Sequence, residues 1–293
     1  YFLLFLSTIV TSTKALVFKG TSTKASSMTN VFLSNALTFL VALVVALFMA
    51  GERLAELFTV SNETIILAAI FSLVTLFTQV TQILAMMLGT ASSTSLIYSC
   101  GFLVPTFAGV IFWQEKVSTG RIIGVALIVL AVYLIVDTSK DKRKKSLKWL
   151  AAAVSAMLLA GACGVVQKIQ AGGASAGELP LFLIFTFFFS SSVSFVIFII
   201  KSRRAGKNYI PPSSARSFCV LAVISGCCLG FANLINFTIA GKLPATVQFP
   251  VYNIGNMVLT GVLSAIIFKE RPGKRQIAGY VIGCAAMAII GLL

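Results

Sequence analysis

The sequence predicts an all-α polytopic membrane protein with ten transmembrane helices, arranged as a 5+5 inverted-topology repeat. Of the 293 residues, 58% are hydrophobic and only 11% are charged, whereas soluble domains are about half apolar and about a quarter charged. The apolar residues form long runs, and about 20 such residues cross the hydrocarbon core as a helix. The chain also resembles itself at a fixed offset, which predicts two related halves.

Apolar runs bounded by charged residues or by Gly, Pro and Ser clusters define ten expected helices. They cover residues 1–18, 31–50, 64–88, 93–113, 121–137, 148–167, 179–200, 217–240, 245–268 and 275–293. The first run is rich in Ser and Thr and contains Lys14. No small-residue cleavage pattern follows it, so we expect a membrane helix rather than a signal peptide.

Charged residues mark the other boundaries. In the first half, Glu52 follows the second run, Glu63 precedes the third and Glu115 follows the fourth. In the second half, Lys148 starts the sixth run and Glu178 precedes the seventh. The remaining runs are separated by basic loops.

The composition excludes several kinds of chemistry. The chain has no His, which is the commonest metal ligand and the commonest general base near neutral pH. All eight acidic residues fall at or beyond the ends of the apolar runs, and the six cysteines lie inside apolar runs without CxxC spacing. We therefore expect no enzyme activity, no metal and no cofactor. The net charge of +15 comes from clusters between apolar runs, a layout that indicates a lipid bilayer rather than nucleic acid as the partner.

Internal similarity divides the chain into two repeats. A shift of 155 residues superposes GTASSTSLIYSCGFLVPTFAGVIFWQEKVSTGRIIGVALIVL on PATVQFPVYNIGNMVLTGVLSAIIFKERPGKRQIAGYVIGCAA. We assign residues 1–137 and 148–293 to two five-helix repeats and residues 138–147 to a basic linker. An odd number of helices in each repeat inverts the second relative to the first. Inverted repeats are typical of secondary transporters, whose substrate site lies near the bilayer midplane.

The ends of the fourth and ninth helices carry a family resemblance. Gln114-Glu115-Lys116 and Phe268-Lys269-Glu270-Arg271 each follow an apolar helix and precede a Gly-containing one. Together with Phe249-Pro250, this pattern resembles the EamA-type branch of the drug/metabolite transporter superfamily over essentially the whole chain. The resemblance implies a ten-helix transporter with a central cavity for amino acids, nucleotide-related metabolites or other organic solutes.

Paired amides occur within the third and eighth helices. Gln79 and Gln82 share one helix face, and Asn233 and Asn236 have the same spacing. The repeat places the two pairs at nearly the same depth, where they face a substrate cavity or hydrogen-bond between helices.

Polar residues crowd into two turns of the otherwise apolar ninth helix. Pro250 removes a backbone donor there and predicts a broken or kinked helix. The polar side chains that surround it are Gln248, Tyr252, Asn253 and Asn256. The repeat counterpart, the fourth helix, contains Ser95, Tyr98, Ser99 and Pro105. We expect the fourth and ninth helices to line the transport pathway or, alternatively, to use their kinks only for packing.

Lys14 is the only charge well inside an expected span. It either snorkels to the membrane surface or binds an anion, depending on its depth. Lys19 and Lys168 are expected at the membrane interface, and Glu115 and Glu270 are expected to cap the final helix of each repeat. Small-xxx-small pairs at Gly226/Gly230 and Gly279/Gly283 fit packing within the chain better than homodimerisation.

These features predict a secondary transporter that moves a small-molecule substrate by alternating access in the bacterial cytoplasmic (inner) membrane, as a monomer. A polyspecific drug exporter is the alternative, although the first helix has Ser12, Thr13 and Lys14 where a cation exporter needs a Glu. The basic loops place both termini outside the cell, whereas the family resemblance implies cytoplasmic termini.

Overall fold

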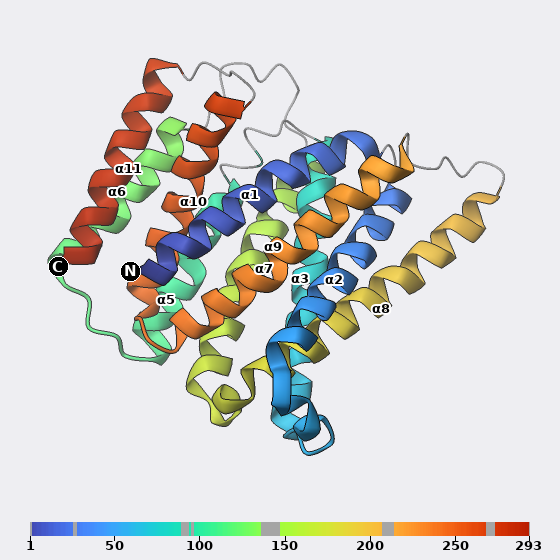
Figure 1. The fold of residues 1–293 in the computed structure, drawn as a ribbon. Coiled ribbons are helices and arrows are strands. Elements are labelled where there is room, and N and C mark those ends of the chain that lie inside the picture. The colour runs from blue at the N-terminus through green and yellow to red at the C-terminus, as the bar shows by residue number, and fades with distance from the viewer. Residues whose placement is uncertain are drawn as a thin grey trace. The chain divides into compact units, whose positions relative to one another are not determined.

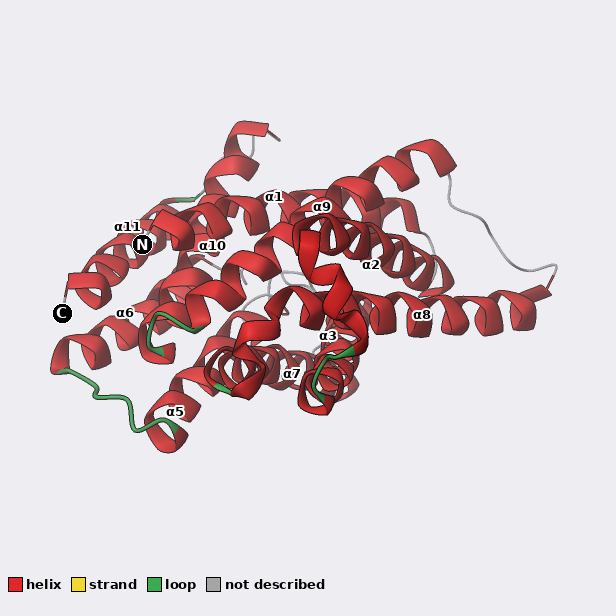
Figure 2. Cartoon of the chain, turned by 60° about the horizontal axis from the view of Figure 1, so that its bottom comes forward, coloured by secondary structure: helices red, strands yellow, loops and turns green. Residues whose placement is uncertain are grey.

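The computed structural model of the chain describes residues 2–25, 28–88, 94, 97–135, 147–206, 214–267 and 273–292. Within these ranges the backbone is helical apart from short turns, and it contains no strand (Figures 1 and 2). Ten α-helices lie in this part of the chain: α1 (Phe2–Ala25), α2 (Met28–Ala50), α3 (Asn62–Leu88), α5 (Leu103–Phe112), α6 (Thr119–Ile135), α7 (Leu147–Gly172), α8 (Leu179–Ala205), α9 (Ala215–Ala240), α10 (Ala245–Ile267) and α11 (Lys274–Leu292).

Each predicted run is helical where the structure describes it, except at Trp113, the last residue of the fourth run. The largest differences are at carboxyl ends: α1 continues to Ala25 instead of stopping at residue 18, α7 to Gly172 instead of 167, and α8 to Ala205 instead of 200. Each extension begins with a lysine, so hydropathy alone places the boundary too early. A helix of 24 residues is about 36 Å long and extends past a hydrocarbon core of about 30 Å.

Five of the described helical stretches are long and apolar enough to cross a membrane: Thr29–Glu56, Asn62–Ala85, Leu147–Gly172, Ser175–Ala205 and Ala215–Ala240. Bulky apolar side chains remain exposed on many helices, including Phe48, Phe112 and Ile266. In water such exposure would be costly, whereas lipid tails accommodate it. The chain is therefore an all-helical integral membrane protein.

Three short 3-10 helices were not expected from the sequence: η1 (Gly51–Phe58), η2 (Cys100–Phe102) and η3 (Ala174–Glu178). η1 and η3 replace expected loops, and η2 leads into α5. Runs of this kind are typical of connections and helix ends.

The chain divides into two compact units, each built from separate segments. Unit 1 comprises Tyr1–Thr8, Phe77–Ile169 and Ile239–Leu293, and unit 2 comprises Ile9–Leu76 and Gln170–Thr238. Each unit therefore draws on both of the predicted repeats. The compact units are defined by contacts and the proposed repeats by sequence similarity, so this division does not test the 5+5 repeat. The repeat remains a prediction.

Close helix packing in unit 1 depends on glycine. α6 packs along α11, and the two helices lie side by side in Figure 1. A Cβ atom at Gly279 would lie 2.9 Å from the Ile135 nitrogen and 3.0 Å from the Ala131 oxygen. Only glycine allows this approach of two backbones. Arg275 completes the contact by donating to the Tyr133 carbonyl at 2.9 Å and lying over the Tyr133 ring.

Unit 2 has an aromatic centre and a close α2–α8 contact. The rings of Phe71, Phe182 and Phe237 have centroids 5.0–5.8 Å apart, the range in which aromatic pairs attract. Ser191 on α8 donates to the Ala36 carbonyl on α2 at 3.1 Å. The glycines of the Gly226/Gly230 pair pack against α2, so this small-residue motif serves contacts within the chain.

The carboxylate of Glu178 links neighbouring segments at one end of unit 2. Glu178, the last residue of η3, accepts hydrogen bonds from the Ser61 backbone nitrogen at 3.3 Å and the Ser61 hydroxyl at 2.8 Å. Ser61 immediately precedes α3 and also accepts from the Thr64 nitrogen as an N-cap. Arg53 on η1 donates to the Gly177 carbonyl. These contacts join η1, η3 and the start of α3.

Candidate functional site

The predicted site residues fall into the two units. Those in unit 1 are Gln79, Gln82, Tyr98, Gln248, Tyr252, Asn253 and Asn256, and those in unit 2 are Lys14, Asn233 and Asn236. The expected meeting of the two amide pairs would join residues of different units, and it remains a prediction. Each unit is therefore described by itself.

α10 presents the polar residues of the ninth predicted helix. Gln248 is buried, with 2% of its surface exposed, and Tyr252, Asn253 and Asn256 are half-buried. The Asn256 carboxamide oxygen accepts a hydrogen bond from the Thr260 hydroxyl at 3.4 Å. Polar side chains thus occur along α10 from Gln248 to Thr260.

Of the broken or kinked helix expected at Pro250, the break is not observed, because α10 is one continuous helix from Ala245 to Ile267. The kink remains a prediction. Pro250 is the sixth residue of the helix, so it removes a hydrogen bond only near the helix start. Residues 245–251 are all buried, and this packing holds the first turns in helical form.

A polar cluster in unit 1 connects four helical segments. Tyr98 interacts electrostatically with Cys163 on α7 and Tyr252 on α10. Cys163 in turn lies 3.9 Å, sulfur to oxygen, from the Thr78 hydroxyl on α3. Tyr98 and Tyr252, from the fourth and ninth predicted helices, therefore lie near each other in unit 1. A transport pathway lined by these two helices remains a prediction.

Sequence reasoning missed Thr78 and Cys163 as members of this cluster. Cys163 was interpreted as an apolar space-filler, which is the usual role of a buried cysteine. Thr78 had a usable signal, because the 155-residue offset aligns it with Asn233. Hydroxyl groups in membrane helices commonly bond their own backbone, so they attract less attention than amides.

In unit 2 the predicted amides behave differently from each other. The Asn233 side-chain nitrogen donates to the Leu229 carbonyl of its own helix at 3.0 Å. Asn236 is buried, with 8% of its surface exposed. Lys14 is half-buried and lies close enough to Cys228 on α9 to interact with it electrostatically.

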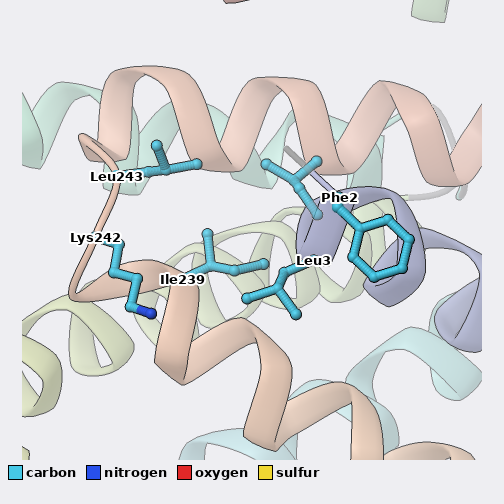
Figure 3. A pocket seen from close by; sticks show the side chains of 6 residues that line it. Phe2, Leu3, Ile239, Lys242 and Leu243 are labelled. Atoms are coloured by element: carbon cyan, nitrogen blue, oxygen red, sulfur yellow. The ribbon is translucent and has the colours of Figure 1, made fainter.

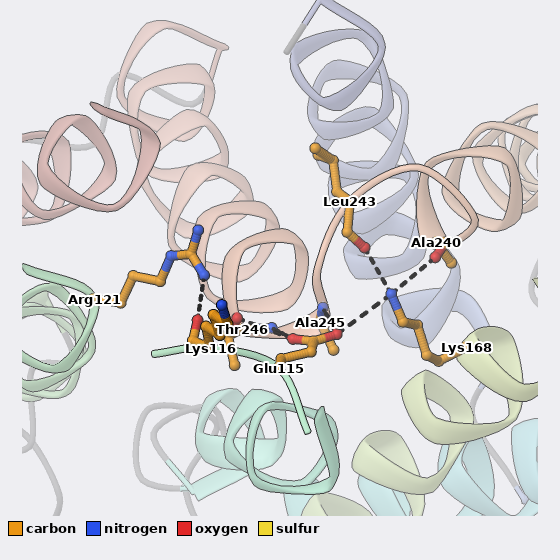
Figure 4. A network of polar contacts seen from close by, with 8 residues as sticks. All are labelled: Glu115, Lys116, Arg121, Lys168, Ala240, Leu243, Ala245 and Thr246. Carbon is orange, nitrogen blue, oxygen red and sulfur yellow. Dashed lines mark hydrogen bonds and ion pairs between the residues drawn. The ribbon is translucent and has the colours of Figure 1, made fainter. Parts of the chain in front are cut away.

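The densest polar network in unit 1 surrounds Glu115, between α5 and α6 (Figure 4). Its carboxylate accepts hydrogen bonds from the Ala245 nitrogen at 2.7 Å, the Thr246 nitrogen at 2.9 Å and the Thr246 hydroxyl at 3.0 Å. Glu115 also pairs with Lys168, at 3.4 Å between nitrogen and oxygen. The Lys168 ammonium donates to the carbonyls of Ala240 at 3.2 Å and Leu243 at 2.8 Å.

The network corrects one prediction. Glu115 caps α10, which belongs to the second predicted repeat, and does not cap α6, the final helix of its own repeat. At α6 the Ser118 hydroxyl takes the capping role by accepting from the Arg121 nitrogen at 3.3 Å. The carboxylate reaches α10 because Gln114, with φ of 49°, turns the chain immediately before it. Glu270 and the side chain of Lys19 lie outside the described residues.

The charges of this network match the helix dipoles. Negative Glu115 lies at the amino end of α10, and positive Lys168 lies at the carboxyl end of α9, the arrangement that stabilises both. Burial raises the pKa of the Glu115 carboxyl, but hydrogen bonds from Thr246 and Ala245 and the charge of Lys168 outweigh it. The pKa therefore lies below its usual value, and Glu115 is ionised at neutral pH.

A small pocket opens beside the turn between α9 and α10 (Figure 3). Its volume is about 200 Å³, and its lining consists of Phe2, Leu3, Leu4, Ile239, Lys242 and Leu243. Ligand pockets usually measure about 300 to 1,000 Å³ and contain several convergent polar groups. This pocket has only one polar side chain, so it does not resemble a site for a polar solute.

The described residues contain no group of three His, Cys, Asp or Glu side chains that could hold a metal. All six cysteines are free thiols. The polar cluster and the polar residues of α10 supply hydroxyl and amide groups, which can bind and orient a solute.

Comparisons with known proteins give a fold and no family. No protein-family model matches the chain, and no curated protein matches it. Solved structures do match. One of them, described only as the crystal structure of a protein, has a TM-score of 0.79 and 14% sequence identity over 99% of this chain and 96% of its own. At this identity the likeness shows the fold alone.

Proposed function

We propose that this protein is a secondary transporter of small organic metabolites in the bacterial cytoplasmic membrane. In this proposal the two five-helix repeats are related by inverted topology and rock against each other to give alternating access. The resemblance to the EamA-type branch supports the same function. The solute is an amino acid, a nucleotide-related compound or a comparable small metabolite.

The observation that carries the proposal is the polar cluster of Thr78, Tyr98, Cys163 and Tyr252, together with the polar face of α10. Polar groups inside a membrane helix are costly unless another polar group or water satisfies them. Here several segments bring hydroxyl and amide groups together in one unit. Such a surface suits reversible binding of a polar solute.

The Glu115–Lys168 network holds the first residues of α10 in place. It attaches the first residues of α10 to α7 and to the α9–α10 turn. Asn253 and Asn256 follow two to three turns later on the same helix. The network thereby positions the polar face without taking part in solute binding.

The experiment is uptake of radiolabelled amino acids, nucleosides and vitamins into proteoliposomes. We expect Asn253→Ala and Asn256→Ala to reduce transport of the accepted solute about tenfold, because a solute group left unpaired costs about 1 to 3 kcal/mol. Folded yield should change little, since an interhelical hydrogen bond averages only about 0.6 kcal/mol.

Val262→Ala is the matched control. Val262 lies on the same helix with 42% of its surface exposed, so its truncation should leave transport unchanged. Unchanged transport in both asparagine variants would show that these two residues of α10 do not bind the solute. Absence of uptake for every solute in the wild-type protein would contradict the transporter proposal itself.

A further inference from the structure

The charged side chains of unit 2 are divided between two ends. η1, η3 and the start of α3 form one end, where hydrogen bonds of Arg53 and Glu178 join them. α8 starts directly after Glu178 and is about 40 Å long, so its last turn lies at the opposite end. The acidic end holds every acid in the described part of unit 2: Glu52, Glu56, Glu63 and Glu178. The basic end carries Lys201, Arg203, Arg204 and Arg216.

Three helices of unit 2 meet the membrane surface at the basic end. α8 and α9 are both long and apolar enough to span a membrane, and only residues 206–214 separate them. The end of α8 and the start of α9, with Arg216, therefore lie on the same side. The Lys201 ammonium lies 5.4 Å from the centre of the Phe32 ring in the second turn of α2, a cation–π contact that brings α2 to this side as well.

The length of α8 sets the depth of these cations. Its uncharged run from Leu179 to Ile200 is about 33 Å long, which is close to the thickness of a hydrocarbon core of about 30 Å. When this run fills the core, Lys201, Arg203 and Arg204 begin where the lipid headgroups begin. The basic side chains thus lie at the level of the headgroup phosphates.

Arg203 continues the lipid-facing side of α8. Val196 and Ile200 are 53% and 46% exposed, whereas Ser190 and Ser194 on the opposite side are at most 1% exposed. Arg203 follows Val196 by seven residues and Ile200 by three, the spacings that keep side chains on one helix face. Arg203 is itself exposed. The apolar stripe that suits lipid tails therefore leads directly to a cation at headgroup level.

We propose that the basic end of unit 2 is a binding surface for the headgroups of anionic phospholipids. A guanidinium pairs with a phosphate through two parallel hydrogen bonds, and each basic residue near the membrane surface favours an anionic headgroup over a neutral one. At the acidic end the described charges are mostly negative and repel the same headgroups. The preference for anionic lipid is therefore local to one end of the unit.

The test places a tryptophan near each end and measures how strongly brominated lipids quench its fluorescence. Val196→Trp changes a position seven residues before Arg203, and Ile70→Trp changes a position seven residues after Glu63 on α3. The two positions are 53% and 44% exposed, so both tryptophans contact lipid. The emission of each added tryptophan is obtained by subtracting the emission of the unsubstituted protein in the same vesicles.

Phosphatidylcholine vesicles contain an equal fraction of either dibrominated phosphatidylglycerol or dibrominated phosphatidylcholine. In Val196→Trp we expect the quenching to show about fivefold local enrichment of the anionic over the neutral lipid. Adding Arg203→Gln and Arg204→Gln should bring this ratio close to one, whereas Arg203→Lys and Arg204→Lys should preserve it because the charge remains. In Ile70→Trp, the matched control, the ratio should be one or lower. Both leaflets have the same composition, so the direction of insertion does not affect the result.

Three results would overturn the proposal: a ratio near one in Val196→Trp, a ratio that survives the paired glutamine substitution, or an equal enrichment in Ile70→Trp, which would reflect only the net charge of the protein. If the glutamine variant does not fold, salt replaces it, because the Debye length falls from about 10 Å at about 0.1 M to about 3 Å at about 1 M. A ratio that does not fall with salt also overturns the proposal. No transport is measured, so this result is separate from the outcome for the transporter function.

Discussion

Glu115 shows how much one side chain contributes when it satisfies several orphan groups at once. The first four backbone N–H groups of a helix have no partner within the helix, and two of those in α10 donate to this carboxylate. Its side chain is 10% exposed, and that of Lys168 is 15% exposed. A charge pair this well buried is sensitive to loss of either partner.

We predict that Glu115→Gln lowers the free energy of unfolding by about 2 to 3 kcal/mol at pH 7, because charged hydrogen bonds are lost and an amide offers one acceptor oxygen in place of two. Thermal unfolding in detergent, followed by circular dichroism, measures the change. Glu56→Gln is the matched control, since Glu56 is exposed on η1.

The pH dependence of this difference follows from the lowered pKa of Glu115. A carboxyl whose pKa is lower in the folded than in the unfolded chain stabilises the fold above its unfolded value of 4.5. That contribution is lost as the pH falls through the folded pKa. We expect the stability gap between wild type and Glu115→Gln to be constant from pH 6 to 8 and to narrow below about pH 4.5. A gap that closes between pH 6 and 8 would contradict this assignment.

At the scale of the helix, Gly279 of α11 determines how closely α6 approaches. We predict that Gly279→Ala destabilises the protein by about 1 to 3 kcal/mol, since the new methyl group meets backbone atoms of Ile135 and Ala131 that cannot move aside. Gly172→Ala is the matched control, because a Cβ there meets nothing within 4 Å. Equal unfolding temperatures for the two variants would show that the α6–α11 contact is looser than described.

The same scale shows what the sequence could predict and what it could not. Helix positions follow from hydropathy, because each span must be apolar over about 20 residues. The proximity of Tyr98 to Tyr252 was not predicted from the sequence, which placed them only in two helices related by the proposed repeat. The role of Glu115 was not predictable in this way, because its partners are 130 and 131 residues away and belong to another helix. Contacts of that range depend on how helices assemble, which local patterns do not encode.

For the molecule as a whole, the placement of acids limits the coupling mechanism. The five acidic residues that the structure describes lie in η1, η3, a loop or the first turn of α3. None of them occupies the middle of a described helix, where desolvation would raise a carboxyl pKa toward neutrality. Asp137, Asp141 and Glu270 lie outside the described residues and, by sequence, at or beyond the ends of the apolar runs.

We therefore predict facilitated diffusion or exchange without proton coupling through a carboxylate. An imposed pH gradient across proteoliposomes should not drive concentrative uptake by the wild-type protein. Lys14→Met is measured beside it, because the amine of Lys14, the charge inside the first expected span, is the alternative titrating group. Concentrative uptake in both proteins would reveal a proton path that does not involve Lys14.

The division into two units has a consequence for how the molecule holds together. All four points at which the chain passes from one unit to the other lie inside helices: between Thr8 and Ile9 in α1, Leu76 and Phe77 in α3, Ile169 and Gln170 in α7, and Thr238 and Ile239 in α9. Cutting the chain only in the loops between helices would therefore not separate the two units. The units are thus not modules that could be inherited or exchanged separately. Unwinding any one of these four helices changes the structure of both units.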